Sequence, residues 1–209
     1  MKLTYKKGKQ DKIHISVDGE YSFTVDETYF LSMGIWNGKE VDDDELEEIK
    51  QTVSVRRAYN YAVSLLSRRD HSERELMTKL TQKGYAEGAE EAISKLKDSG
   101  YVSDERFARL YVRELQILKK YGKRRIEQEL FRKGVDREII REVLDETEFA
   151  QDELVSLIER KYGRYLSDEK GLQKTINGLL RMGYSYGEIR DALRVINENL
   201  QAEDEVCYE

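Results

Sequence analysis

The fold follows from Ser72-Glu-Arg-Glu-Leu-Met-Thr-Lys-Leu-Thr-Gln-Lys-Gly-Tyr85, because this pattern returns twice further along the chain. The later copies are Gly122-Lys-Arg-Arg-Ile-Glu-Gln-Glu-Leu-Phe-Arg-Lys-Gly-Val135 and Gly171-Leu-Gln-Lys-Thr-Ile-Asn-Gly-Leu-Leu-Arg-Met-Gly-Tyr184. A recurrence at about fifty residues indicates tandem supersecondary units. Such arrays present long surfaces, and we expect a binding protein rather than an enzyme.

Each copy is the middle helix of a predicted three-helix repeat. In the first repeat, Ser72 and Glu75 form a capping box at the helix start. A glycine closes each copy, because the residue that ends a helix often needs a positive φ, which glycine adopts without steric cost. In the third repeat, Thr175 stands where Leu76 and Ile126 stand. A terminal unit that faces solvent on one side is expected to diverge in this way.

Apolar stripes predict the flanking helices. One stripe begins after Ser103 and runs along a single long helix: Phe107, Leu110, Tyr111, Leu115 and Leu118. In the third repeat, Ser185 and Glu188 form a further capping box. The stripe pattern therefore predicts helices on both sides of each glycine-ended helix.

The first 25 residues favour strands. Lys12–Val17 and Tyr21–Val25 alternate apolar and polar residues, and Asp18-Gly19 between them is typical of a tight hairpin turn. A short helix from Glu27, with Asp26 as its cap, should support this hairpin. The single tryptophan, Trp36, is expected to be a packing anchor.

The predicted fold class is mainly α: three tandem three-helix repeats in an elongated, curved array, with a small N-terminal β-hairpin plus helix. We expect five segments along the chain. They are the N-terminal part at 1–50, the repeats at 51–102, 103–147 and 148–200, and an acidic, disordered tail at 201–209.

Composition narrows the class of protein further. The chain has 209 residues, 37% of them charged, and a net charge of −6, which argues against nonspecific coating of DNA. Its one cysteine, Cys207, is expected to be passive, and no disulfide can form within the chain. We find no membrane-spanning stretch and no signal peptide, and we expect a cytoplasmic monomer without membrane contact.

No catalytic constellation is visible. The two histidines, His14 and His71, are too few and too far apart in sequence for a metal or nucleophile site, and no phosphate-binding loop occurs. We therefore expect no enzyme activity and no cofactor. A DNA-reading helix-turn-helix is also disfavoured, because the helices after Gly84 and Gly134 begin with acidic residues that would repel phosphate.

The strongest candidate for a functional surface is basic. It could be a face for an acidic protein or a nucleoprotein, or a solvated face whose charges are paired, and Tyr121 within it could stack on a base or pack beneath the cations. The candidate residues are Arg68, Arg69, Lys83, Lys119, Lys120, Tyr121, Lys123, Arg124, Arg125, Arg132 and Lys133.

Several segments together resemble the RecX family of regulatory proteins. They are Leu65-Leu-Ser-Arg-Arg-Asp-His-Ser-Glu-Arg-Glu-Leu76, Leu80-Thr-Gln-Lys-Gly-Tyr85, Gly100-Tyr-Val-Ser-Asp-Glu-Arg-Phe-Ala108 and Gly122-Lys-Arg-Arg-Ile126. The resemblance covers roughly residues 50–200, and the third repeat matches least well.

This resemblance implies a regulator of the RecA recombinase. Family members bind in the groove of the RecA–DNA filament and modulate, usually downward, its ATPase, strand-exchange and coprotease activities in recombination, DNA repair and the SOS response. DNA is then a partner mainly as part of the filament. Two alternatives stay open: a helical protein that binds single- or double-stranded DNA directly, and a scaffold without regulatory effect. Charge reversal at Lys123, Arg124 and Arg125 is expected to weaken filament binding.

Overall fold

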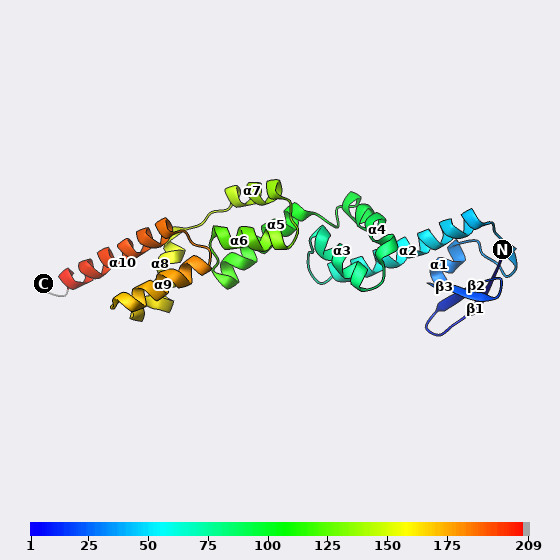
Figure 1. Ribbon diagram of the computed structural model, residues 1–209, viewed down its shortest axis with the longest axis horizontal. Helices are drawn as coiled ribbons and strands as arrows, with labels where there is room; N and C mark the ends of the chain where they lie inside the picture. The colour runs from blue at the N-terminus through cyan, green and yellow to red at the C-terminus, as the bar shows by residue number, and fades with distance from the viewer. Residues whose placement is uncertain (207–209) are drawn as a thin grey trace. The chain divides into compact units, whose positions relative to one another are not determined.

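The structure is a computed structural model that describes the backbone of residues 1–206 and the side chains up to residue 199 (Figure 1). Cys207 lies outside the described residues. The chain divides into two compact units. The first consists of Met1–Arg69 and Leu76–Tyr101, and the second of Asp70–Glu75 and the chain from Val102 onward.

The first unit begins with a four-stranded antiparallel sheet in the order β3-β2-β1-β4. Its strands are β1 (Lys2–Lys7), β2 (Lys12–Val17), β3 (Glu20–Asp26) and β4 (Lys39–Glu40). The predicted hairpin is β2–β3, and Asp18 and Gly19 both have the positive φ, 51° and 89°, that such a tight turn needs. The sheet is larger than the predicted hairpin, because β1 pairs with the other edge of β2 and β4 pairs with β1.

Helices α1 (Glu27–Ser32) and α2 (Asp43–Leu66) follow. Asp26 caps α1 as predicted, by accepting a 2.8 Å hydrogen bond from the Tyr29 amide. The expectation for Trp36 is wrong, because its side chain is 61% exposed, with the Lys39 ammonium over the ring. Helix α2 is unbroken across the boundary expected at residues 50 and 51, and its first half packs on the sheet core.

The first repeat consists of the second half of α2, α3 (Glu73–Gln82) and α4 (Ala86–Asp98). Its interior is made of small and medium apolar side chains. The fully buried ones are Ala58, Ala62, Leu76, Leu80, Ala89, Ala92 and Leu96.

The second repeat consists of α5 (Asp104–Glu114), a π-helical turn (Leu115–Lys119), α6 (Lys123–Arg132) and α7 (Arg137–Glu146). The predicted stripe on its first helix is only partly right: Phe107 and Leu115 are buried, but Leu110 is 46% and Leu118 is 69% exposed. A π-helical turn has more residues than an α-turn, so the positions from the turn onward, Leu118 among them, rotate to another face. This rotation brings Leu118 to the surface.

The third repeat consists of α8 (Gln151–Tyr162), a 3₁₀ turn (Gly163–Tyr165), α9 (Glu169–Arg181) and α10 (Tyr186–Val206). Thr175 is buried, and its hydroxyl donates a 3.0 Å hydrogen bond to the Gly171 carbonyl. The capping box of Ser185 and Glu188 is complete, with hydrogen bonds in both directions. Helix α10 continues to Val206, where a disordered tail from residue 201 was expected.

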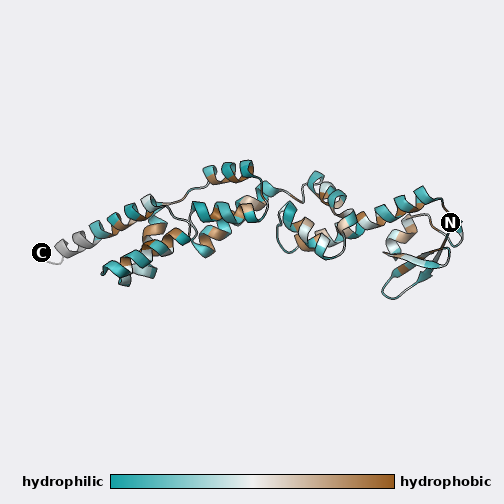
Figure 2. Ribbon diagram, in the orientation of Figure 1, coloured by the Kyte–Doolittle hydropathy of each residue, from teal (hydrophilic) through white to brown (hydrophobic). Residues whose placement is uncertain are grey.

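In the second and third repeats, α6 to α9 turn apolar sides toward their neighbours, as the hydropathy colours show (Figure 2). The predicted class of fold, mainly helical with three-helix repeats behind a small N-terminal sheet, is confirmed. The elongated, curved arrangement of the repeats stays a prediction.

Candidate partner-binding surface

The predicted basic stretch lies where the second repeat meets the third. Gly122 precedes α6, and its amide donates a 2.9 Å hydrogen bond to the Met182 carbonyl. The Arg124 amide donates to the Gly183 carbonyl at 3.3 Å. The first amides of a helix have no partner within it, and the third repeat satisfies the Arg124 amide of α6 and the Gly122 amide before it. The basic stretch is therefore also a joint between two repeats.

Glycine at position 122 follows from this contact. A Cβ built on Gly122 would lie 2.7 Å from the carbonyl carbon and oxygen of Gly183, closer than real Cβ contacts come. The usual capping residues serine, threonine and aspartate all carry a Cβ. Close approach of two backbones therefore replaces side-chain capping at the start of α6.

Most of the predicted cations of the second repeat are paired with acids. In the second repeat, Lys123 pairs with Asp145 at 3.0 Å, and Arg125 pairs with Glu129 at 2.9 Å. Arg132 also pairs with Glu129. Lys120 reaches Glu153 of the third repeat at 3.4 Å, and Lys133 pairs with Glu75 at 2.6 Å. A large part of this basic stretch is thus neutralised within the molecule.

Two of the predicted cations in the second repeat are not part of these ion pairs. Lys119 and Arg124 are exposed and form no ion pair with any residue that the structure describes. The π-helical turn that ends at Lys119 also exposes Ile117, 65%, and Leu118, 69%. An exposed apolar pair beside unpaired cations is suited to contact with a partner surface. Ile117 escaped the sequence prediction, because no periodic signal marks a π-helical turn.

Tyr121 packs beneath a cation. Its ring centre lies 5.6 Å from the Arg125 guanidinium carbon, and both side chains are half-buried. The Arg125 Nε atom is buried and has no hydrogen-bond partner among the described residues. A tyrosine face attracts a cation that has lost part of its hydration. Of the two interpretations of Tyr121, packing is the one that this geometry favours.

The remaining candidates belong to the first unit. Arg68 and Arg69 are exposed at the end of α2. Lys83, just after α3, is exposed, and its ammonium lies 5.9 Å from the ring centre of Tyr61. The structure does not bring these three together with the second-repeat cations in one unit.

Tyr184 of the third repeat contributes a further hydrogen bond to the joint between the second and third repeats. Its hydroxyl donates a 3.0 Å hydrogen bond to the Lys120 carbonyl. Burial raises the pKa of Tyr184 to about 12, and the nearby carboxylates of Glu153 and Glu188 act in the same direction. The phenol therefore stays protonated and available as a donor.

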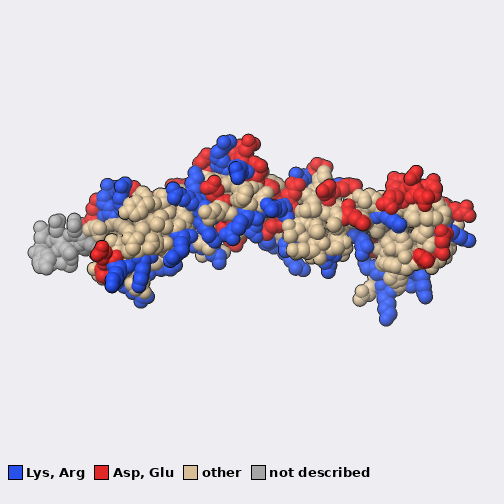
Figure 3. All heavy atoms as spheres, in the orientation of Figure 1, with Lys and Arg blue, Asp and Glu red and all other residues tan. Residues whose placement is uncertain are grey.

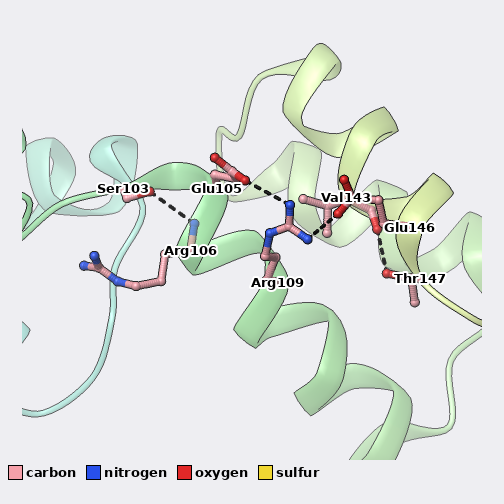
Figure 4. A network of polar contacts seen from close by, with 7 residues as sticks. All are labelled: Ser103, Glu105, Arg106, Arg109, Val143, Glu146 and Thr147. Carbon is pink, nitrogen blue, oxygen red and sulfur yellow. Dashed lines mark hydrogen bonds and ion pairs between the residues drawn. The ribbon is translucent and has the colours of Figure 1, made fainter.

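A polar network on the other side of the second repeat ties α5 to α7 (Figure 4). Arg109 lies between Glu105, at 2.9 Å on its own helix, and Glu146 at the end of α7. Ser103 caps α5 through the Arg106 amide at 3.2 Å. The pair of Arg109 with Glu105 is visible in the sequence as an i,i+4 spacing. Its contact with Glu146 depends on the fold and could not be predicted.

Charge is mixed along this repeat. Figure 3 shows Lys and Arg side chains over α5 and α6, and acids and bases side by side over α7. Between α6 and α7 runs a groove of about 650 Å³ with Phe131, Ile140 and Leu144 in its lining.

Within the described part of the chain, no cluster of three or more His, Cys, Asp or Glu side chains could hold a metal ion. None of the described helices combines the length and apolar character needed to cross a bilayer.

Comparison with known proteins accounts for the three repeats. Family models match each of them: the first three-helix domain of RecX at residues 58–101, the second at 103–144 and the third at 148–193. A solved structure, "Crystal structure of regulatory protein RecX", superposes with a TM-score of 0.63 at 22% identity and covers 91% of this chain and 98% of its own. RecX from Lactobacillus salivarius superposes with a TM-score of 0.61 at 26% identity over 69% of this chain and 97% of its own.

Whole-chain relatives agree with the domain matches. Regulatory protein RecX of Caldanaerobacter subterraneus is 35% identical over 192 residues, which are 91% of this chain and 96% of that protein. Regulatory protein RecX of Listeria monocytogenes is 32% identical over 211 aligned positions, which cover 97% of this chain and 77% of the relative. The chain therefore belongs to the RecX family of regulatory proteins.

Proposed function

We propose that this protein is a non-enzymatic regulator that binds the RecA–DNA filament in the cytoplasm and lowers recombinase activity. The affected activities are ATP hydrolysis, strand exchange and coprotease function. Membership of a family of regulatory proteins, with all three repeats matched, is the observation that carries this proposal. The filament is the direct partner, and DNA is contacted mainly as part of it.

The exposed residues of the π-helical turn and of the start of α6 support the proposal. Lys119 and Arg124 offer unpaired positive charge beside Ile117 and Leu118. Such a surface can contact both protein and phosphate. A regulator acts by binding one filament state better than another, because a ligand shifts an equilibrium only through differential affinity.

Charge reversal at the unpaired cations tests this surface. The double variant Lys119→Glu/Arg124→Glu leaves the backbone hydrogen bonds of Gly122 and Arg124 and the ion pair of Lys120 with Glu153 intact, so the joint between repeats is retained. Its dissociation constant for RecA filaments on single-stranded DNA, measured by co-sedimentation, is expected to rise at least about tenfold, equivalent to about 1.4 kcal/mol.

The matched control is Lys170→Glu/Lys174→Glu, which makes the same charge change at exposed lysines of α9. It is expected to bind filaments as the wild type does. Equal affinity of wild type and both variants would remove this surface from the proposal. Binding of the wild type to naked DNA that is as tight as binding to filaments, with a steep salt dependence, would favour the direct DNA-binding alternative.

A further inference from the structure

The end of α6 in the second repeat is covered by the start of α3. The Ser72 hydroxyl donates a 2.6 Å hydrogen bond to the Lys133 carbonyl, and the Glu75 carboxylate pairs with the Lys133 ammonium at 2.6 Å. The Arg74 side chain lies against Gly134, so closely that a Cβ on this glycine would lie 2.8 Å from Arg74 Cγ. A helix start that carries the Ser72 hydroxyl, the Arg74 side chain and the Glu75 carboxylate thus docks on Lys133 and Gly134 at the end of α6.

The same surface exists at the end of α3 in the first repeat. Lys83 and Gly84 lie 50 residues before Lys133 and Gly134, and Tyr61 lies 50 residues before Tyr111. Both lysines sit over their tyrosines, at 5.9 Å in the first repeat and 5.5 Å in the second. Both glycines have a positive φ, 85° and 82°. The docking surface is therefore repeated in residue type and in geometry.

In the first repeat this surface is open. A Cβ built on Gly84 would meet no atom of the described residues within 4 Å. Lys83 is exposed and has no ion pair in the part of the chain that the structure describes. Arg57 lies over Tyr85, the residue after Gly84, at 5.6 Å and adds a second positive charge.

The contacts at the covered surface, Lys133 and Gly134, indicate which chemical groups a partner would need to bind the open surface at Lys83 and Gly84. Lys133 is satisfied by a carboxylate in the first turn of a helix, and the Lys133 carbonyl by the hydroxyl of the residue before that helix. The corresponding partner for Lys83 is a helix that starts with a serine or threonine and carries a glutamate or aspartate three residues later. Such a start is a common capping sequence in proteins.

A second copy of this chain offers two described helix starts of this kind, and both are already engaged within their own chain. Ser185 and Glu188 at the start of α10 form a closed capping box, in which the Glu188 carboxylate accepts the Ser185 amide at 2.6 Å. The start of α3 is already docked on α6, and the equivalent of Glu75 is Arg125 in α6 and Lys174 in α9. Either cation would face Lys83 and repel it. The occupant is therefore a helix of another protein.

We propose that Lys83, Gly84 and Tyr61 form a docking site for the acidic first turn of a partner helix. This inference rests on the proposed function, under which the partner helix belongs to a RecA subunit. Docking there adds a contact at the first repeat that is independent of Lys119 and Arg124.

Two variants and two controls test the site. Gly84→Asn keeps a residue that tolerates a left-handed backbone but fills the contact, and Lys83→Glu reverses the charge. Each is expected to raise the dissociation constant for RecA filaments on single-stranded DNA at least about tenfold. Gly34→Asn, at another helix-ending glycine with positive φ and open space, and Lys9→Glu, at another exposed lysine of the first unit, are expected to bind as the wild type does.

The outcomes separate this inference from the proposed function. Wild-type affinity in both Gly84→Asn and Lys83→Glu would overturn the docking site and leave the regulator intact. A wild-type protein that fails to bind filaments would overturn the proposed function and, with it, the RecA partner. Self-association by analytical ultracentrifugation, abolished in Gly84→Asn, would show that a second copy occupies the site and would overturn the assignment to another protein.

Discussion

Gly122 and Gly183 hold the second and third repeats together at the residue scale. Gly183 ends its helix with a φ of 94°, and its carbonyl accepts the Arg124 amide. A Cβ on Gly183 would lie 2.9 Å from Arg125 Cα, and one on Gly122 would collide with Gly183 in turn. The absence of two side chains therefore allows two backbones to hydrogen-bond directly.

Gly122→Ala isolates this close approach from backbone strain. Gly122 has an ordinary φ of −78°, so an alanine there costs only the collision with Gly183. We expect the free energy of unfolding in urea to fall by about 1–3 kcal/mol, as for other overpacked sites. Gly163→Ala, where a Cβ would meet nothing within 4 Å of described residues, is the control and should be neutral or stabilising. Equal stability of the two variants would contradict the packing at this joint.

Tyr184 gives the joint a dependence on alkaline pH. Its pKa is raised from 10.0 to about 12 in the folded protein. Between these values the unfolded chain has lost the phenolic proton that the folded protein keeps, so this contribution to stability falls as pH rises. Tyr184→Phe should be less stable than wild type by about 1 kcal/mol at pH 8, from the lost hydrogen bond to Lys120.

The difference in unfolding free energy between wild type and Tyr184→Phe is then expected to shrink from pH 10 to pH 12. Denaturant unfolding followed by circular dichroism at both pH values measures it. A difference that stays constant would show that Tyr184 keeps an ordinary pKa.

At the scale of elements, the caps at helix starts determine where helices begin. Ser185 and Glu188 exchange hydrogen bonds at the start of α10, with the Ser185 amide donating at 2.6 Å to Glu188 and the Glu188 amide donating at 3.2 Å to Ser185. Both satisfy groups that the helix leaves without partners. This box was predictable because it depends only on residue types at a fixed spacing.

Ser185→Ala removes one half of that box. The free energy of unfolding is expected to fall by about 1 kcal/mol, whereas Ser185→Asp should retain most of it, since aspartate also caps. Ser156→Ala, at an exposed site inside α8, is the control and should be neutral or slightly stabilising. Thermal unfolding of the three variants measures the differences, and an equal loss in Ser185→Asp and Ser185→Ala would argue against capping.

Other elements show where a sequence pattern stops being informative. Helical periodicity predicted Phe107 and Leu115 as core, but it failed at Leu118, because a π-helical turn changes the rotation per residue. The repeated glycines were predicted as helix ends. Their second role, as contacts for Arg74 and Arg125 of the preceding repeat, could not be predicted, because it depends on how successive repeats pack. The sequence also does not predict which cations pair with acids distant in the chain, as Lys123 does with Asp145.

At the scale of the whole molecule, a chain with 37% charged residues folds around several small apolar cores. Each repeat has a small apolar core of its own, and backbone contacts through glycine join the second repeat to the third. The two units present different candidate surfaces: Lys119 and Arg124 in the second, and Lys83 with Gly84 in the first. Under the proposed function, a filament of identical subunits would offer each surface a partner.

The most direct test of the proposed function is steady-state ATP hydrolysis by RecA on single-stranded DNA, titrated with this protein. The proposal predicts that the rate falls and levels off as the protein saturates the filament, and that Lys119→Glu/Arg124→Glu needs a higher concentration for the same effect. An ATPase rate that stays unchanged while the protein is bound to filaments would contradict regulation and leave only a scaffold.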